Sequence, residues 1–212
     1  PRSGSSLVAR IIAQHGVWTG TCRPADLDNP HGYYEHIGLA SLIGETVGHS
    51  VNRGVIPGAP DGWVESVERV LRADGYESGR SVGGGMADDH INLAVGSEGG
   101  GSGRWLWMGS AVYWRLFDPF DPYWIVLERD RDEMLRSCVR SGAMRPRPHT
   151  LKAHEHAIES VRARGAVTVN TDDLIGGDMS ALRDALLRGG IDLRPEIVEA
   201  CVDPDLWHGR AA

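Results

Sequence analysis

Apolar positions along this chain repeat with two periods, and each period predicts a different kind of element. Repeats at helical spacing predict a first helix near the N-terminus, which meets a stop signal at Gly16. Further helices are expected at Ile37–His49, Gly62–Ala73, Ala111–Phe117, Asp132–Ser141, Thr150–Arg164, Ser180–Arg188 and Pro195–Cys201. Short apolar or β-branched runs predict strands at Tyr123–Glu128 and Val167–Asn170.

The order of these elements predicts the fold class. Strands that alternate with helices indicate an α/β fold of three layers, in which a parallel sheet has helices on both faces. The 212 residues suffice for one full core, so a single domain over 1–212 is expected. The segment Gly79–Gly103 is rich in Gly, Ser and Asp without a sustained period, so it is expected to be a flexible excursion.

Charge and cysteine content narrow the class of protein further. The formal net charge of −7 argues against general binding to nucleic acid. Cys22, Cys138 and Cys201 are widely spaced and odd in number, so they predict neither a disulfide framework nor a zinc site. Because this cysteine usage fits a reducing compartment best, we expect a cytoplasmic protein. We find no signal peptide and no apolar run long enough to span a membrane.

Candidate chemistry is concentrated in Pro1–Ser6, which leads directly into the first predicted helix. The stretch combines an arginine, a glycine and three serines. A glycine-containing loop that opens a helix directs backbone N–H groups toward one point at the positive end of the helix dipole, which suits phosphate or sulfate. The Walker spacing of nucleoside-triphosphate loops is absent. The sequence therefore predicts an anion site of another kind.

This hexapeptide resembles the 5′-phosphosulfate-binding loop of the sulfotransferases, which transfer a sulfuryl group from 3′-phosphoadenosine-5′-phosphosulfate (PAPS) to an acceptor. The residues that the resemblance assigns to the 5′-phosphosulfate are Arg2, Ser3, Gly4, Ser5 and Ser6. Arg2 is also expected to stabilise charge during transfer. The resemblance implies a P-loop NTPase-like sulfotransferase fold, in which the loop follows a buried strand. Since the printed sequence begins at Pro1, that first strand is expected to be missing from it.

Three other segments resemble parts of the same family. Tyr123–Glu128 is followed by Arg129 and, eight positions later, by Ser137, which is the spacing of the family's 3′-phosphate-binding element. The resemblance implies that Arg129 and Ser137 hold the 3′-phosphate. Asn29–Glu35 resembles the Asn-Pro-x-Gly-aromatic-x-Glu segment of many bacterial members, and Thr171–Leu174 resembles an acidic-acidic-Leu segment after a late strand.

The implied reaction needs a base, because an acceptor hydroxyl must lose its proton. Glu35 is the first candidate, since related sulfotransferases often use a glutamate that follows the first helix. His36 and His31 are alternatives, because imidazole titrates closest to neutral pH. A structural role for these residues also remains open.

The resemblance implies PAPS as donor, adenosine 3′,5′-bisphosphate as product, no metal, and a small-molecule or carbohydrate acceptor. The chain departs from the family where many members carry Lys-Asp-Pro-Arg, since Met108–Ala111 stands there. The alternatives are a P-loop small-molecule kinase, or a degenerate nucleotide-binding relative without turnover. Two interpretations are open for the aromatic residues Trp105, Trp107, Tyr113 and Trp114. They line an acceptor pocket or, as is the default for large aromatic side chains, they pack in the core.

Overall fold

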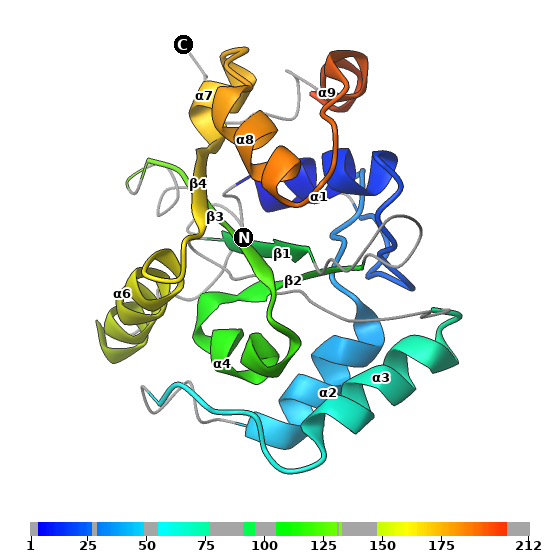
Figure 1. Ribbon diagram of the computed structural model, residues 1–212, viewed down its shortest axis with the longest axis vertical. Helices are drawn as coiled ribbons and strands as arrows, with labels where there is room; N and C mark the ends of the chain where they lie inside the picture. The colour runs from blue at the N-terminus through cyan, green and yellow to red at the C-terminus, as the bar shows by residue number, and fades with distance from the viewer. Residues whose placement is uncertain are drawn as a thin grey trace.

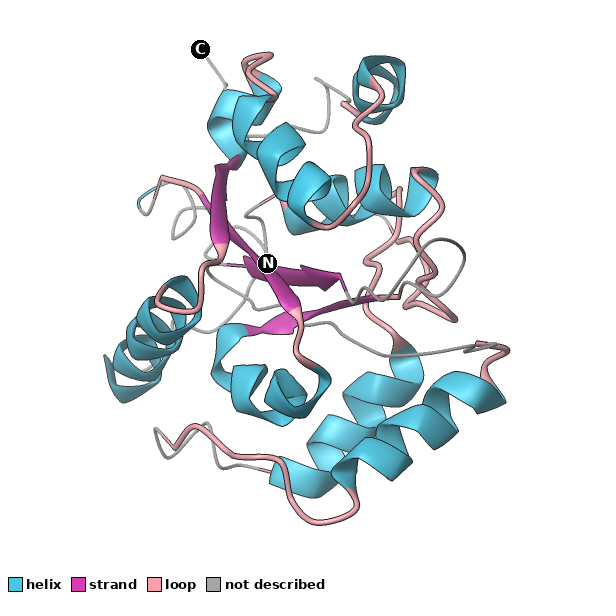
Figure 2. Cartoon of the chain, viewed as in Figure 1, coloured by secondary structure: helices cyan, strands magenta, loops and turns pink. Residues whose placement is uncertain are grey.

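The computed structural model describes residues 4–26, 29–48, 55–76, 91–95, 105–130, 132 and 148–202. Helices and strands are mixed along these ranges (Figures 1 and 2). The α-helices are α1 (Ser5–Gln14), α2 (Ile37–Val47), α3 (Trp63–Ala73), α4 (Trp114–Phe117), α6 (Pro148–Arg162), α7 (Thr171–Ile175), α8 (Ser180–Arg188) and α9 (Pro195–Cys201). The 3-10 turns η2 (Ala111–Tyr113) and η3 (Asp118–Phe120) flank α4, and the strands are β1 (Ile91–Val95), β2 (Leu106–Ser110), β3 (Tyr123–Glu128) and β4 (Val167–Asn170).

The strands form one mixed sheet in the order β2-β1-β3-β4. β3 and β4 are parallel, and Glu128 lies beside Asn170 at their carboxyl ends. β1 is antiparallel to both of its neighbours, so that Leu93 pairs with Met108 of β2 and with Ile125 of β3. The carboxyl ends of β3 and β4 therefore lie side by side at one edge of the sheet.

The sheet corrects the expectation of parallel pairing throughout, which holds only between β3 and β4. The difference comes from β1, which lies inside the Gly-rich segment expected to be an excursion. Antiparallel neighbours need no long crossover connection, so a short strand in such a segment can pair this way. Nothing in the local pattern of this run indicated the pairing, because strand formation depends on neighbours that are distant in sequence.

Most predicted helices are confirmed to within a few residues, since their apolar stripes are strong and local. α3 begins one residue later than predicted, at Trp63, and Gly62 with φ 73° is its N-cap residue. β2 and α7 were not predicted. The helix expected at Asp132–Ser141 lies outside the described residues after Asp132.

An aromatic cluster around Phe117 forms part of the core. The Phe117 ring stacks on Trp107 with centroids 4.0 Å apart, and it contacts Trp63 edge-on at 6.1 Å. Trp105 and Phe120 complete the cluster. Trp105 and Trp107 are thus buried packing residues, and α3, β2 and α4 share one core through them.

Helices pack against the sheet from several directions (Figure 1). α8 packs against β4, α1 contacts both β2 and α9, and α6 contacts β3 and η2. The helices in the described part of the chain include none whose length and apolar character would let it cross a membrane.

Candidate functional site

The candidate site lies at the carboxyl edge of β3 and β4. Ligands of open α/β sheets bind outside the carboxyl ends of the strands. Three segments distant in sequence meet here: Gly4 at the start of α1, Arg129 directly after β3, and Thr171 directly after β4. The edge therefore combines a helix N-terminus with an arginine.

Gly4 gives the start of α1 its shape. Its φ of 82° lies in the left-handed region that side chains disfavour, and its carbonyl accepts the hydrogen bond from Val8 N at 3.1 Å. The N–H groups of a helix's first turn have no acceptor within the helix. The first turn of α1 contains no acidic residue. The positive end of α1 thus keeps the character that favours an anion.

Thr171 packs directly against Gly4. A Cβ built on Gly4 would lie 2.7 Å from Thr171 Cγ2 and 2.8 Å from its Cβ, so only glycine fits at this contact. Thr171 is fully buried, and its hydroxyl donates a hydrogen bond to the carbonyl of Glu128 at 3.1 Å. The start of α1 and the end of β3 are consequently joined through one side chain.

Arg129 places a positive charge at this edge. Its side chain is only 6% exposed, and its Nε lies 3.7 Å from Asp172 Oδ1. The other oxygen of Asp172 accepts a hydrogen bond from Asp130 N at 3.4 Å. Because a nearly buried guanidinium is costly to desolvate unless an anion faces it, this position suits a carboxylate or a phosphate.

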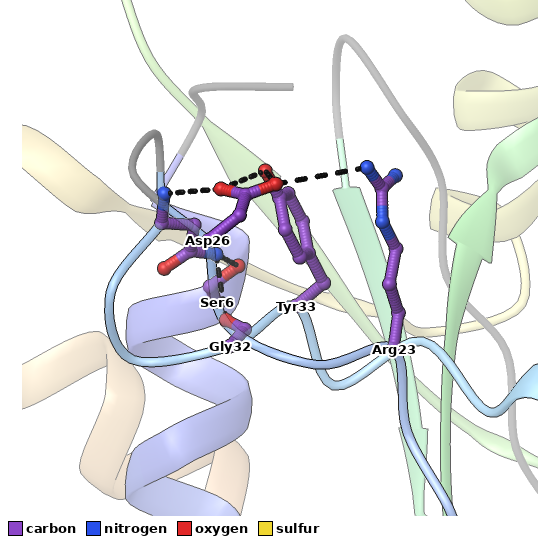
Figure 3. A network of polar contacts seen from close by, with 6 residues as sticks. Ser6, Arg23, Asp26, Gly32 and Tyr33 are labelled. Carbon is purple, nitrogen blue, oxygen red and sulfur yellow. Dashed lines mark hydrogen bonds and ion pairs between the residues drawn. The ribbon is translucent and has the colours of Figure 1, made fainter.

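The segment after α1 returns to the first turn of that helix (Figure 3). The Asn29 amide donates to Ser6 Oγ at 2.8 Å and to the Gly32 carbonyl at 2.6 Å. Tyr33 donates its hydroxyl proton to the Asp26 carboxylate at 2.8 Å, and the Arg23 guanidinium lies 4.2 Å from the centre of the Tyr33 ring. These contacts fix the loop beside Ser6, in the first turn of α1.

Glu35 lies at the end of this loop and is half-buried. Its carbonyl accepts a hydrogen bond from Arg23 N at 2.9 Å, so the loop pairs with the chain before it. Burial first, and then the negative charges of Asp74 and Glu35, raise the pKa of Cys22 to about 11. The Glu35 carboxylate is therefore near a thiol that stays protonated at neutral pH.

His36 is held by contacts of its own. Its ring is buried, Nδ1 accepts a hydrogen bond from Leu39 N at 3.2 Å at the start of α2, and Nε2 lies 3.3 Å from Asp74 Oδ2. Burial lowers the pKa of His36, and the Asp74 charge opposes that effect only in part. Near neutral pH the ring is thus neutral and caps α2, with its Nε2–H facing Asp74. His31 is exposed.

The structure thus brings Gly4 and the start of α1 together with Arg129, and it holds the Glu35 loop against Ser6. Arg2, Ser3 and Ser137 lie outside the described residues. Ser5 is buried as the first residue of α1. His36 is placed in a separate cluster with Asp74.

Two contributors to the site were not found by sequence reasoning. The Thr171 hydroxyl and the Asn29 side chain both join segments distant in the chain. A threonine directly after a strand and before two acidic residues was the available signal for Thr171. Within the described ranges, no group of three or more His, Cys, Asp or Glu side chains is arranged to hold a metal ion.

Comparisons of the chain with protein-family models, with curated proteins and with solved structures found no match.

Proposed function

We propose that this protein is a PAPS-dependent sulfotransferase that transfers a sulfuryl group to an acceptor hydroxyl or amine by in-line displacement. One observation carries the proposal: the start of α1, at Gly4, and the nearly buried Arg129 meet at the carboxyl edge of β3 and β4. A nucleotide with phosphate groups on both its 5′ and 3′ oxygens needs two anion-binding features close together. The sequence resemblance assigns the same two features to those two groups.

In this proposal the residues divide between binding and chemistry. Arg2 and the amides of Ser3, Gly4, Ser5 and Ser6 hold the 5′-phosphosulfate, while Arg129 and Ser137 hold the 3′-phosphate. The acceptor oxygen forms a bond to sulfur as the bond from sulfur to the bridging phosphate oxygen breaks. The leaving group is adenosine 3′,5′-bisphosphate, and Glu35 takes the acceptor's proton. Arg2 stabilises the charge that develops on the leaving oxygen.

The proposal includes the P-loop sulfotransferase architecture of three layers. The parallel pair β3 and β4 and the helix that follows Gly4 support this architecture. The antiparallel β1, which lies between β2 and β3, is a feature that the resemblance does not account for.

The test compares the affinity for adenosine 3′,5′-bisphosphate with that for AMP, by calorimetry. We expect the bisphosphate to bind much more tightly, because Arg129 makes charged hydrogen bonds to the 3′-phosphate. Arg129→Ala is expected to remove about 1.5–3 kcal/mol of that preference. Arg188→Ala is the matched control, since Arg188 is an exposed arginine on α8 that pairs with Asp184. Equal affinities for the two nucleotides in the unmutated protein would contradict the proposal.

Two further measurements separate the alternatives. Greater thermal stabilisation by ATP with Mg²⁺ than by adenosine 3′,5′-bisphosphate would indicate a kinase. Transfer of labelled sulfate from PAPS to a pool of hydroxyl acceptors distinguishes an enzyme from a binding protein without turnover.

A further inference from the structure

The side chain of Thr171, the first residue of α7, makes its contacts outside that helix. α7 is capped by Asn170, whose side chain accepts hydrogen bonds from the backbone of Asp172 at 2.8 Å and of Asp173 at 3.4 Å. The Thr171 hydroxyl instead donates to Glu128, the residue before Arg129. Its methyl group and Cβ face the opposite partner, Gly4.

This arrangement joins two segments that otherwise belong to different parts of the chain. On one side the contact is so close that a side chain at Gly4 would clash with Thr171. On the other side the hydrogen bond to the Glu128 carbonyl fixes the end of β3, from which the Arg129 side chain extends. Asp172, the next residue, is paired with Arg129. A shift of the β4–α7 turn would therefore move both segments relative to each other.

We infer that Thr171 is a positioning residue that sets the spacing between the element for the 5′-phosphosulfate and the element for the 3′-phosphate. The inference rests on the proposed function. A ligand held at two points gains affinity from the second point only when the spacing of the two sites matches the ligand. A β-branched, fully buried side chain suits this role, because its χ1 angle is stiff and its close-packed surroundings transmit displacements.

A change at Thr171 should alter the affinity for some nucleotides and leave the affinity for others unchanged. Nucleotides with one phosphate group use one element, so the spacing does not matter to them. The nucleotide with both groups uses both elements at once, so it loses affinity when the spacing is no longer held.

The experiment measures the dissociation constants of AMP, adenosine 3′-monophosphate and adenosine 3′,5′-bisphosphate for three variants. Thr171→Val keeps the shape and removes the hydroxyl, while Thr171→Ser keeps the hydroxyl and removes the methyl group beside Gly4. We expect each to weaken binding of the bisphosphate by roughly tenfold, about the effect of one buried hydrogen bond or contact, and each monophosphate by less than about twofold. Thr168→Val is the matched control on β4, where the hydroxyl accepts a hydrogen bond from Arg162 Nε at 3.4 Å, and all three constants are expected to stay unchanged.

The outcomes separate this inference from the proposed function. If the unmutated protein binds the bisphosphate no better than AMP, both fail. If it prefers the bisphosphate and the Thr171 variants keep that preference, or lose affinity for all three nucleotides equally, only the role of Thr171 is refuted. Because Thr171→Ser is conservative, it gives this answer even if Thr171→Val does not fold.

Discussion

At the scale of single residues, Glu35 and His36 are adjacent in sequence and differ in environment. The Glu35 carboxylate is half-buried at the end of a loop that is bonded to the first turn of α1. The His36 ring is buried, caps α2 and faces Asp74. A base must reach a bound acceptor and exchange a proton, so these environments favour Glu35 for that role and give His36 a part in stability.

The Glu35→Gln variant tests the proposed base. The substitution keeps the shape of the side chain and removes its basic oxygen, so turnover should fall by roughly 10²–10⁴-fold. The affinity for adenosine 3′,5′-bisphosphate should stay nearly constant, because the carboxylate is proposed to contact the acceptor. Steady-state transfer of labelled sulfate measures the first quantity and calorimetry the second. Near-normal turnover would remove Glu35 from the mechanism.

His36 makes the stability of the protein depend on pH. Its pKa is lowered in the folded state, first by burial, so the unfolded chain binds a proton more readily than the folded one. The free energy of unfolding should therefore decrease as pH falls below the usual histidine value of about 6.5, and recover as pH rises again. Asp74 acts in the same direction at lower pH: burial raises its pKa, but the hydrogen bonds from Thr21 and the interaction with His36 together lower the pKa below the usual value.

Urea denaturation between about pH 7 and pH 5 measures this dependence across the window below the unfolded pKa. His36→Asn keeps an N-cap acceptor and removes the titrating ring, so the slope of stability against pH should flatten. An unchanged slope in that variant would assign the pH dependence to other groups.

At the scale of elements, the local pattern of apolar residues predicts well where a helix or a buried strand lies. The predicted ranges of β3, β4, α8 and α9 are confirmed, because each has a strong periodic or continuous apolar run. β1 was not expected, although it is paired on both sides in the middle of the sheet. Its position depends on pairing with β2 and β3, and these strands come close to β1 only when the chain folds.

Hydrogen exchange tests the place of β1. A strand bonded to neighbours on both sides has few amides free to exchange, so Ile91–Val95 should exchange much more slowly than the loop at residues 55–62. Mass spectrometry of peptides over these two ranges compares them in one sample. Equally rapid exchange in both would contradict the central position of β1.

At the scale of the whole molecule, the aromatic cluster around Phe117 connects α3, β2 and α4 into one core. Phe117 is fully buried and contacts four other aromatic rings. Phe117→Ala should lower the free energy of unfolding by about 3–5 kcal/mol, because a large cavity would open between these elements. Urea denaturation measures the change.

The matched control for Phe117 is Leu187→Ala on α8, whose side chain is 53% exposed. This change should alter stability by no more than about 0.5 kcal/mol. A small effect of Phe117→Ala, similar to that of the control, would show that the cluster does not support the core.

The site shows a similar division between what could be predicted and what could not. The sequence pointed to Gly4 and Arg129 through short motifs beside a helix start and a strand end, and the structure has Gly4 before α1 and Arg129 after β3. The position of Thr171 directly after a strand was a local signal, but its contacts with both segments could not be predicted, since they depend on how the β4–α7 turn packs. The contact between His36 and Asp74 could not be predicted from the sequence either, because the two residues are far apart in the chain.

The sequence by itself determined most of the helices, the strands β3 and β4, and the residue kinds at the candidate anion site, because periodicity, capping and glycine placement act over a few residues. Only the tertiary structure decided the direction of β1, the burial of Arg129 beside Asp172, and the meeting of Gly4 with Thr171. Those features arise from contacts between residues far apart in the chain, and their stability comes from burial and pairing that exist only once the sheet and its helices have packed together.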